Sequence, residues 1–137
     1  MATTINGGCM CGAIRYECSA EPVMSVNCYC RDCQRATGSA MAPVILVPKP
    51  GLRLIKGEPK YYTVKADSGN EVSRGFCTNC GSPMFSLLSG MPEVIAIKAA
   101  SLDDPSIYKP ALNVFVASAP PWAPISKDIP GFAKMPG

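Results

Sequence analysis

The feature that most constrains this chain is the spacing of its cysteines. Eight cysteines occur in 137 residues, and seven of them fall into three short groups. The groups are an N-terminal pair (Cys9, Cys11), a central trio (Cys28, Cys30, Cys33) and a C-terminal pair (Cys77, Cys80). In the C-terminal pair two thiols stand on one tight turn that is followed by Gly81, as in a metal-binding knuckle. A structural zinc takes four protein ligands in a tetrahedral array, so a second pair of ligands must come from elsewhere in the chain.

Two pairings of these groups are open on spacing alone. The N-terminal pair can join the C-terminal pair, or two members of the central trio can do so. The first pairing leaves no ligand unused, because it gives one four-cysteine site and one three-cysteine site. Three protein ligands with an open fourth position are typical of a catalytic zinc. We therefore favour two zinc ions per chain, the second open to water or to a substrate thiolate.

Other interpretations of the same residues remain open. Cys18 or Asp32 could supply a fourth ligand to the central trio and make it a second structural site. The C-terminal pair could be a redox dithiol, although the presence of the N-terminal pair argues for metal. Cys18 stands at the end of an alternating segment and is otherwise predicted to be a small buried hydrophobic residue.

Composition and charge narrow the function classes. Histidine is absent, which excludes catalytic pairs built on an imidazole base. The formal charge of +3 falls to zero if seven cysteines bind two Zn²⁺ ions as thiolates, and no stripe of Lys or Arg is present, so nucleic acid is not an expected partner. The N-terminus lacks the features of a secretory signal, and the longest apolar stretch, 41–47, is far below the ~20 residues of a membrane span. We expect a soluble cytoplasmic protein, in which clustered cysteines more often bind metal or react than form disulfides.

The patterning predicts a mainly β fold with short helical turns, in a single zinc-binding domain over 1–137 with its core at about 5–132. Twelve glycines and 14 prolines disfavour long helices. The expected strands are 13–18, 23–27, 42–47, 52–56, 60–65, 71–76, 94–98 and 113–116. A helical turn is expected over 33–38, closed by Gly38. The proline-rich tail from Pro120 is expected to wrap the surface, with Trp122 as a core plug or pocket wall.

The residues around the cysteines resemble a known enzyme family. The pattern comprises 8–12 (GCMCG) with Tyr16, 28–35 (CYCRDCQR) with Gly38, 76–83 (FCTNCGSP) and the late Pro121-Trp122. Together these segments resemble the glutathione-dependent formaldehyde-activating enzyme family, which also includes a centromere-associated protein, over about residues 5–132. The resemblance implies an Mss4-like fold with two zinc sites. The structural zinc would fall on Cys9, Cys11, Cys77 and Cys80, and the catalytic zinc on Cys28, Cys30 and Cys33.

The resemblance also implies a carbon–sulfur lyase-type reaction. In it a glutathione-like thiol condenses with formaldehyde or a related small aldehyde to an S-hydroxyalkyl adduct, and the reverse reaction splits the adduct. Coordination to zinc lowers the pKa of a thiol strongly, so that its thiolate can attack the aldehyde carbon. Arg31 and Arg35 are candidates for binding the carboxylates of such a substrate.

This sequence departs from the family pattern at two positions. Tyr29 and Asn113 stand in regions where the family often has histidine, so the natural thiol and aldehyde do not follow from the resemblance. A general base and the oligomeric state do not follow from the sequence either. The rival hypotheses are a non-catalytic two-zinc module that binds protein or nucleic acid, and a thiol-redox protein or metallochaperone.

Overall fold

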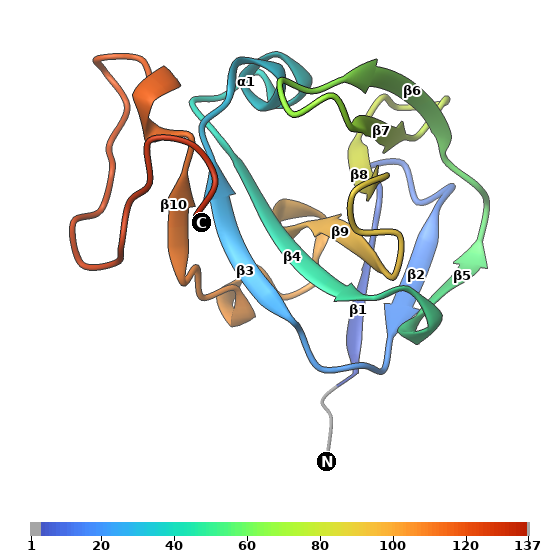
Figure 1. Ribbon diagram of the computed structural model, residues 1–137. Helices are drawn as coiled ribbons and strands as arrows, with labels where there is room; N and C mark the ends of the chain where they lie inside the picture. Colours follow the sequence, from blue (N-terminus) through green and yellow to red (C-terminus); the bar gives the residue numbers. More distant parts are fainter. Residues whose placement is uncertain (1–3, 137) are drawn as a thin grey trace.

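The computed structural model describes residues 4–136 and confirms a mainly β fold (Figure 1). Its strands are β1 (Ile5–Gly8), β2 (Arg15–Cys18), β3 (Met24–Cys28), β4 (Ala42–Pro48), β5 (Leu52–Lys56), β6 (Lys60–Lys65), β7 (Glu71–Phe76), β8 (Pro83–Leu88), β9 (Val94–Lys98) and β10 (Leu112–Val114). The helical segments are α1 (Arg31–Thr37) and short 3₁₀ turns at Lys49–Gly51, Ala99–Ser101, Pro105–Ile107 and Val116–Ser118. No helix within residues 4–136 is long and apolar enough to cross a membrane.

The strands form two sheets that share a core. The smaller sheet has the order β1-β2-β5, and the larger has the order β10-β3-β4-β9-β8-β7-β6. Strand β10 runs parallel to β3, and the other neighbours are antiparallel. Tyr16 of the smaller sheet packs edge-on against Phe85 of the larger one, with ring centroids 5.1 Å apart. This contact lies in a core that also includes Ile5, Ile45 and Ile97, so the smaller sheet covers one face of the larger.

The opposite face of the larger sheet is also buried. Helix α1 contributes Cys33 to a second apolar cluster, which includes Val44 on β4 and Ala96 on β9. Strands covered on both faces are near-continuous apolar runs rather than alternating ones. This explains why every residue of β9 is buried, Lys98 included.

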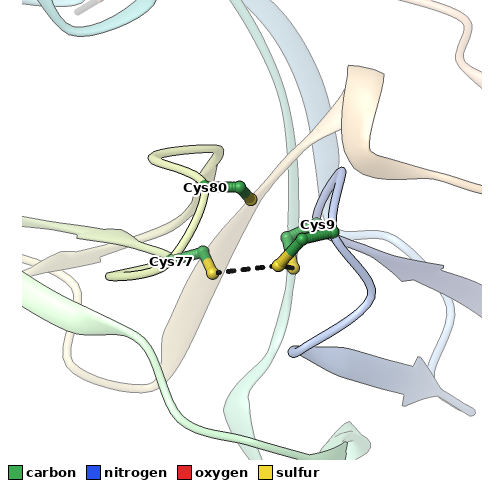
Figure 2. Close-up of side chains that lie close together, drawn as sticks. Cys9, Cys77 and Cys80 are labelled. Atoms are coloured by element: carbon green, nitrogen blue, oxygen red, sulfur yellow. Dashed lines mark hydrogen bonds between the residues drawn. The ribbon is translucent and has the colours of Figure 1, made fainter.

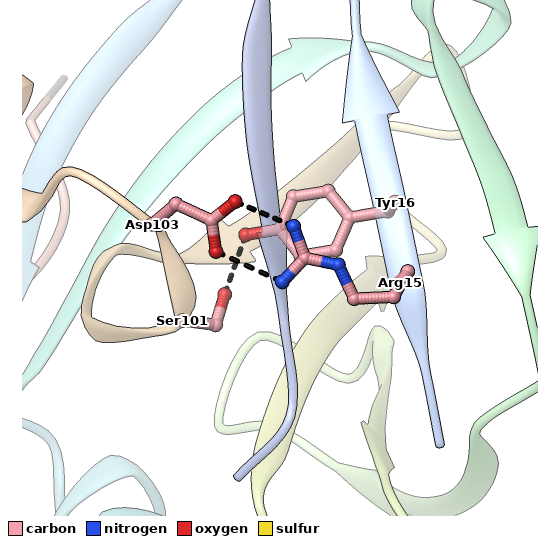
Figure 3. Close-up of polar contacts among 4 residues, drawn as sticks. All are labelled: Arg15, Tyr16, Ser101 and Asp103. Atoms are coloured by element: carbon pink, nitrogen blue, oxygen red, sulfur yellow. Dashed lines mark hydrogen bonds and ion pairs between the residues drawn. The ribbon is translucent and has the colours of Figure 1, made fainter. Parts of the chain in front are cut away.

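Polar contacts fasten the smaller sheet to the segment after β9 (Figure 3). The hydroxyl groups of Tyr16 and Ser101 are 2.6 Å apart, and the Arg15 guanidinium donates to both carboxylate oxygens of Asp103 at 2.9 and 2.5 Å. A Cβ atom on Gly7 would overlap the Tyr16 hydroxyl and the Ser101 carbonyl. Glycine at position 7 therefore lets β1 approach this contact closely.

All eight expected strands are present, four with the expected ends and four with shifted ends, but β1 and β8 were not predicted from the sequence. The segment 5–8 (INGG) is short and glycine-rich, and 83–88 (PMFSLL) lacks alternation because three of its residues are buried in succession. Helix α1 is longer than the expected turn, and Gly38 ends it in the left-handed conformation at φ 69°.

Trp122 is not a core plug, which was one of the two expectations for it. The side chain of this residue is 71% exposed and forms no part of either core cluster. The tail is instead held by hydrogen bonds of Asn113 on β10, whose Nδ2 donates to the Ser126 carbonyl at 3.0 Å. The side chain of Asn113 also accepts from Asn27 Nδ2 at 3.1 Å, so a buried amide pair fixes the tail in place of a buried tryptophan.

Candidate metal centres

The N-terminal and C-terminal cysteine pairs meet between the two sheets. Cys9 directly follows β1 and Cys77 directly follows β7, so each pair lies on a turn at the end of a strand. Figure 2 shows Cys77 and Cys80 on one loop facing Cys9 on another. One ligand atom of each of Cys9, Cys11, Cys77 and Cys80 lies within 4.8 Å of the others. We call this group the four-sulfur cluster.

Each of the two turns is closed by a glycine. Gly12 and Gly81 directly follow the last cysteine of each pair, and both have a positive φ, at 80° and 78°. The Gly81 amide donates to the Cys77 carbonyl at 2.8 Å, and the Gly12 amide donates to the Cys9 carbonyl at 3.2 Å. Glycine adopts this left-handed conformation without steric cost, so each chain can fold back around a shared centre.

The spacing of the sulfur atoms fits a tetrahedral metal. The Cys9–Cys11 and Cys11–Cys77 Sγ separations are 3.7 and 3.8 Å. Four sulfur atoms at the Zn–S bond length of about 2.3 Å would be about 3.8 Å apart along each tetrahedral edge. Hydrogen bonds from the side chain and backbone of Ser82 lower the pKa of Cys80 to about 5, which favours the thiolate that a metal requires. The donor set therefore suits a closed, four-coordinate site.

The central trio forms a second cluster on the other face of the larger sheet. Cys28 ends β3, Cys30 caps the N-terminus of α1, and Cys33 lies in the first turn of that helix. Their sulfur atoms lie within 4.8 Å of one another. The Cys30 sulfur accepts from the Cys33 amide at 3.3 Å, which fixes one sulfur against the helix start. We call this group the three-sulfur cluster.

The three thiols of this cluster differ in acidity. The thiols of Cys28 and Cys30 hydrogen-bond to Cys33 and lower its pKa far below the ordinary value, and the positive charges of Lys98 and Arg74 act in the same direction against the effect of burial. The same thiol contacts raise the pKa of Cys28, and burial raises it further. The cluster thus holds one thiolate readily, and a divalent cation would be needed to stabilise three.

Two cationic side chains that the sequence analysis missed accompany the three-sulfur cluster. Arg74 on β7 directs Nη2 at the Cys33 sulfur over 3.7 Å, and its Nε is buried without a hydrogen-bond partner in the described chain. Lys98 on β9 is 5% exposed, and burial lowers its pKa while the charge of Cys33 raises it. These residues lie 41 and 65 positions after Cys33, so no local motif links them to it.

The other predicted site residues lie elsewhere. Arg31 and Arg35 are on the exposed side of α1, where Arg31 donates to the Gln34 side chain. Asp32 is exposed and outside the three-sulfur cluster. Cys18 is fully buried in the core between the sheets, as expected of a small hydrophobic residue, and joins neither cluster. Residues 4–136 therefore contain no fourth cysteine or carboxylate that completes the three-sulfur cluster.

Position 29 is structural. The Tyr29 side chain is 2% exposed, its amide donates to the Val114 carbonyl at 3.0 Å, and its carbonyl accepts from Gln34 Nε2 at 2.8 Å. These bonds fix the backbone between Cys28 and Cys30.

Phe115 packs against the apolar cluster that contains Cys33. Its backbone is in a left-handed conformation at φ 57°, which a non-glycine residue rarely adopts.

Comparison with known proteins shows the family of the chain. Residues 4–118 match the family described as glutathione-dependent formaldehyde-activating enzyme. A Halomonas elongata protein named after the same family is 24% identical over 126 residues, which cover 88% of this chain and 80% of that protein. The crystal structure of a Rhodobacter sphaeroides protein shares the fold, with a TM-score of 0.60 and 19% identity over 92% of this chain and 98% of that one. The chain therefore belongs to the glutathione-dependent formaldehyde-activating enzyme family.

Proposed function

We propose that this chain is a zinc-dependent, carbon–sulfur lyase-type enzyme that condenses a glutathione-like thiol with formaldehyde or a related small aldehyde, and catalyses the reverse reaction. The observation that carries the proposal is the contrast between the two clusters. One presents four sulfur atoms at tetrahedral spacing, and the other presents three sulfur atoms beside two cations. Four protein ligands are typical of a structural zinc, and three are typical of a catalytic one.

The three-sulfur cluster suits thiol chemistry. When bound there, zinc would supply a centre that lowers the pKa of an incoming thiol and leaves its sulfur nucleophilic. The cysteines Cys28, Cys30 and Cys33 would hold that centre, and α1 together with the end of β3 fixes their positions. The attack itself is simple: the thiol proton goes to solvent, the sulfur forms a bond to the aldehyde carbon, and the carbonyl oxygen takes up a proton from water.

The four-sulfur cluster would serve the fold. It joins the turn after β1 in the smaller sheet to the turn after β7 in the larger sheet, and Met10 donates its amide to the Ser82 hydroxyl at 3.1 Å across the same junction. A metal at this point would clamp two segments that are about 65 residues apart in the chain. Its role is therefore stability rather than chemistry.

The compartment and the small-molecule partners belong to the same proposal. All eight cysteines are free thiols in the described structure, which suits a reducing compartment such as the cytoplasm. The substrates in the name of the family are glutathione and formaldehyde.

The two departures from the family pattern, Tyr29 and Asn113, are both buried. Neither departure therefore changes a side chain that faces solvent.

The proposal is tested by the rate of adduct formation. NMR exchange spectroscopy on mixtures of formaldehyde with glutathione, cysteine or mercaptoethanol separates the catalysed rate from the spontaneous one. We expect the purified protein, with two zinc ions per chain, to accelerate exchange for at least one thiol. Cys30→Ser should abolish the acceleration and Cys18→Ser should keep it, because only Cys30 lies in the three-sulfur cluster. A zinc-loaded protein that accelerates no thiol would favour the non-catalytic two-zinc module.

A further inference from the structure

The strand register places two cations on the face of the larger sheet that carries the three-sulfur cluster. Arg74 on β7 is opposite Ser86 on β8, which is opposite Ala96 on β9, and Lys98 is two residues farther along β9. Because side chains alternate between faces, all four residues point to one face. Ala96 belongs to the same apolar cluster as Cys33, so this is the face that α1 covers.

Within residues 4–136, neither cation forms an ion pair with an acidic side chain. The ion pairs described for residues 4–136 are Arg15–Asp103 and Arg53–Glu17, and neither includes Arg74 or Lys98. A buried cation without a counter-charge is unfavourable, because it loses hydration and gains no pairing. The sulfur atoms of the trio lie near both cations. Arg74 contacts Cys33, and Lys98 is opposite Val44 on β4, two residues from Ala42, which is opposite Cys28 on β3.

The net charge of the site indicates which kind of fourth ligand a metal in the three-sulfur cluster should bind. Three thiolates around a divalent metal carry a net charge of −1, and Arg74 with Lys98 raises the local sum to +1. A neutral fourth ligand leaves that charge uncompensated in a buried site, whereas a thiolate brings the sum to zero. Electrostatic attraction between buried groups is screened far less than between exposed ones. The two cations therefore favour an anionic fourth ligand over a neutral one.

A groove lies beside Lys98. It has a volume of about 660 Å³ and is lined by Lys98, by Thr37 and Ser39 at the end of α1, and by Cys9 of the four-sulfur cluster. This volume lies in the range of small-molecule sites. Lys98 thus belongs both to the groove and to the electrostatic environment of the three-sulfur cluster.

We infer that Arg74 and Lys98 are specificity-determining residues that make the three-sulfur site select a thiolate over a neutral ligand. This inference rests on the proposed function, because it assigns a ligand class to the same site. It concerns cations other than Arg31 and Arg35, which are exposed on α1 and were predicted to bind substrate carboxylates rather than to balance the charge of the sulfur. On binding, the S–H bond of the incoming thiol breaks, its proton goes to solvent, and the two side chains balance the charge of the sulfur that remains.

The test is ligand binding to cobalt-substituted protein, which requires no turnover. Mercaptoethanol is titrated as the anionic ligand through its sulfur-to-cobalt charge-transfer absorption, and imidazole is titrated as the neutral ligand. We expect Arg74→Gln and Lys98→Met each to weaken mercaptoethanol binding at least tenfold and to change imidazole binding less than twofold. Arg74→Lys, which keeps the charge, should recover most of the affinity. Arg31→Gln and Arg35→Gln remove the same charge from the exposed side of α1 and should bind as wild type.

The outcomes separate this inference from the proposed function. If the cobalt protein takes up no thiol at all, the proposed function fails and the inference fails with it. If wild type binds mercaptoethanol and the two neutral variants bind it within twofold of wild type, the inference alone is refuted. Equal weakening of thiol and imidazole would also refute it, because that result reports a damaged site. Circular dichroism shows whether each variant is folded, and the cobalt content shows whether its metal sites are filled. If Arg74→Gln does not fold, Lys98→Met alone provides the test.

Discussion

Replacing Cys77 by serine tests the metal role of the four-sulfur cluster, and Cys18→Ser is its matched control. Both cysteines are buried, with exposures of 2% and 0%, and both substitutions exchange a sulfur for a smaller oxygen. Only Cys77 lies in a cluster. The free-energy cost of burying a hydroxyl group is present in both variants. The difference between their free energies of unfolding therefore measures the contribution of the metal.

The two substitutions are expected to lower the free energy of unfolding by very different amounts. The Cys18 thiol donates to the Ala20 carbonyl at 3.8 Å, a distance that is too long for a good hydroxyl hydrogen bond in Cys18→Ser. The cost is therefore that of a poorly satisfied buried hydroxyl, about 1–3 kcal/mol. Cys77→Ser removes one of four metal ligands, and structural zinc contributes on the order of 10 kcal/mol to folding. Since a domain is stable by only about 5–15 kcal/mol, the loss of that contribution should unfold the chain.

Thermal melts followed by circular dichroism, with zinc content measured on the same samples, provide the comparison. Cys18→Ser should fold, retain two zinc ions and melt a few degrees below wild type, because roughly 1 kcal/mol corresponds to a few degrees in a domain of this size. Cys77→Ser should be unfolded or absent from the soluble fraction. If Cys77→Ser folds and melts within a few degrees of Cys18→Ser, the four-sulfur cluster does not hold a stabilising metal and the argument is wrong.

Three further predictions concern other parts of the structure. Cys30→Ser should keep the fold and lose one of two zinc ions, because the three-sulfur cluster lies at the end of one strand and one short helix; retention of both ions on metal analysis would contradict the ligand assignment. Gly7→Ala should lower the melting temperature by more than 10 °C, since the added methyl overlaps the Tyr16 hydroxyl and the Ser101 carbonyl; an unchanged melt would show that β1 can move aside. Burial raises the pKa of Tyr16 from 10.0 to about 12, so its contribution to stability is complete below pH 10 and is lost as pH rises to about 12. Denaturant titrations should therefore show that the free energy of unfolding of wild type falls by roughly 2–3 kcal/mol more than that of Tyr16→Phe between pH 10 and about 12. An equal fall in both proteins would refute this explanation.

The sequence by itself determined the grouping of the cysteines and the class of the fold. Ligand spacing is a local property: two thiols separated by one or two residues and followed by glycine already define a turn that closes around a centre. The structure brings the sulfur atoms together in the four-and-three division that counting favoured. Strands such as 60–65 and 94–98 were likewise readable, because β-branched and aromatic residues and flanking turns act over a few residues.

Tertiary structure alone decided which charges face the three-sulfur cluster. Arg31 and Arg35 lie next to Cys33 in sequence, yet the helix turns them to solvent, whereas Arg74 and Lys98 reach the cluster from strands far along the chain. The pairing of β7, β8 and β9 and the placement of α1 over their shared face produce that meeting, and neither follows from any local pattern. Trp122 illustrates the same limit, because a large apolar residue is buried only if the fold provides a space for it, and here the Asn113–Asn27 amide pair holds the tail instead.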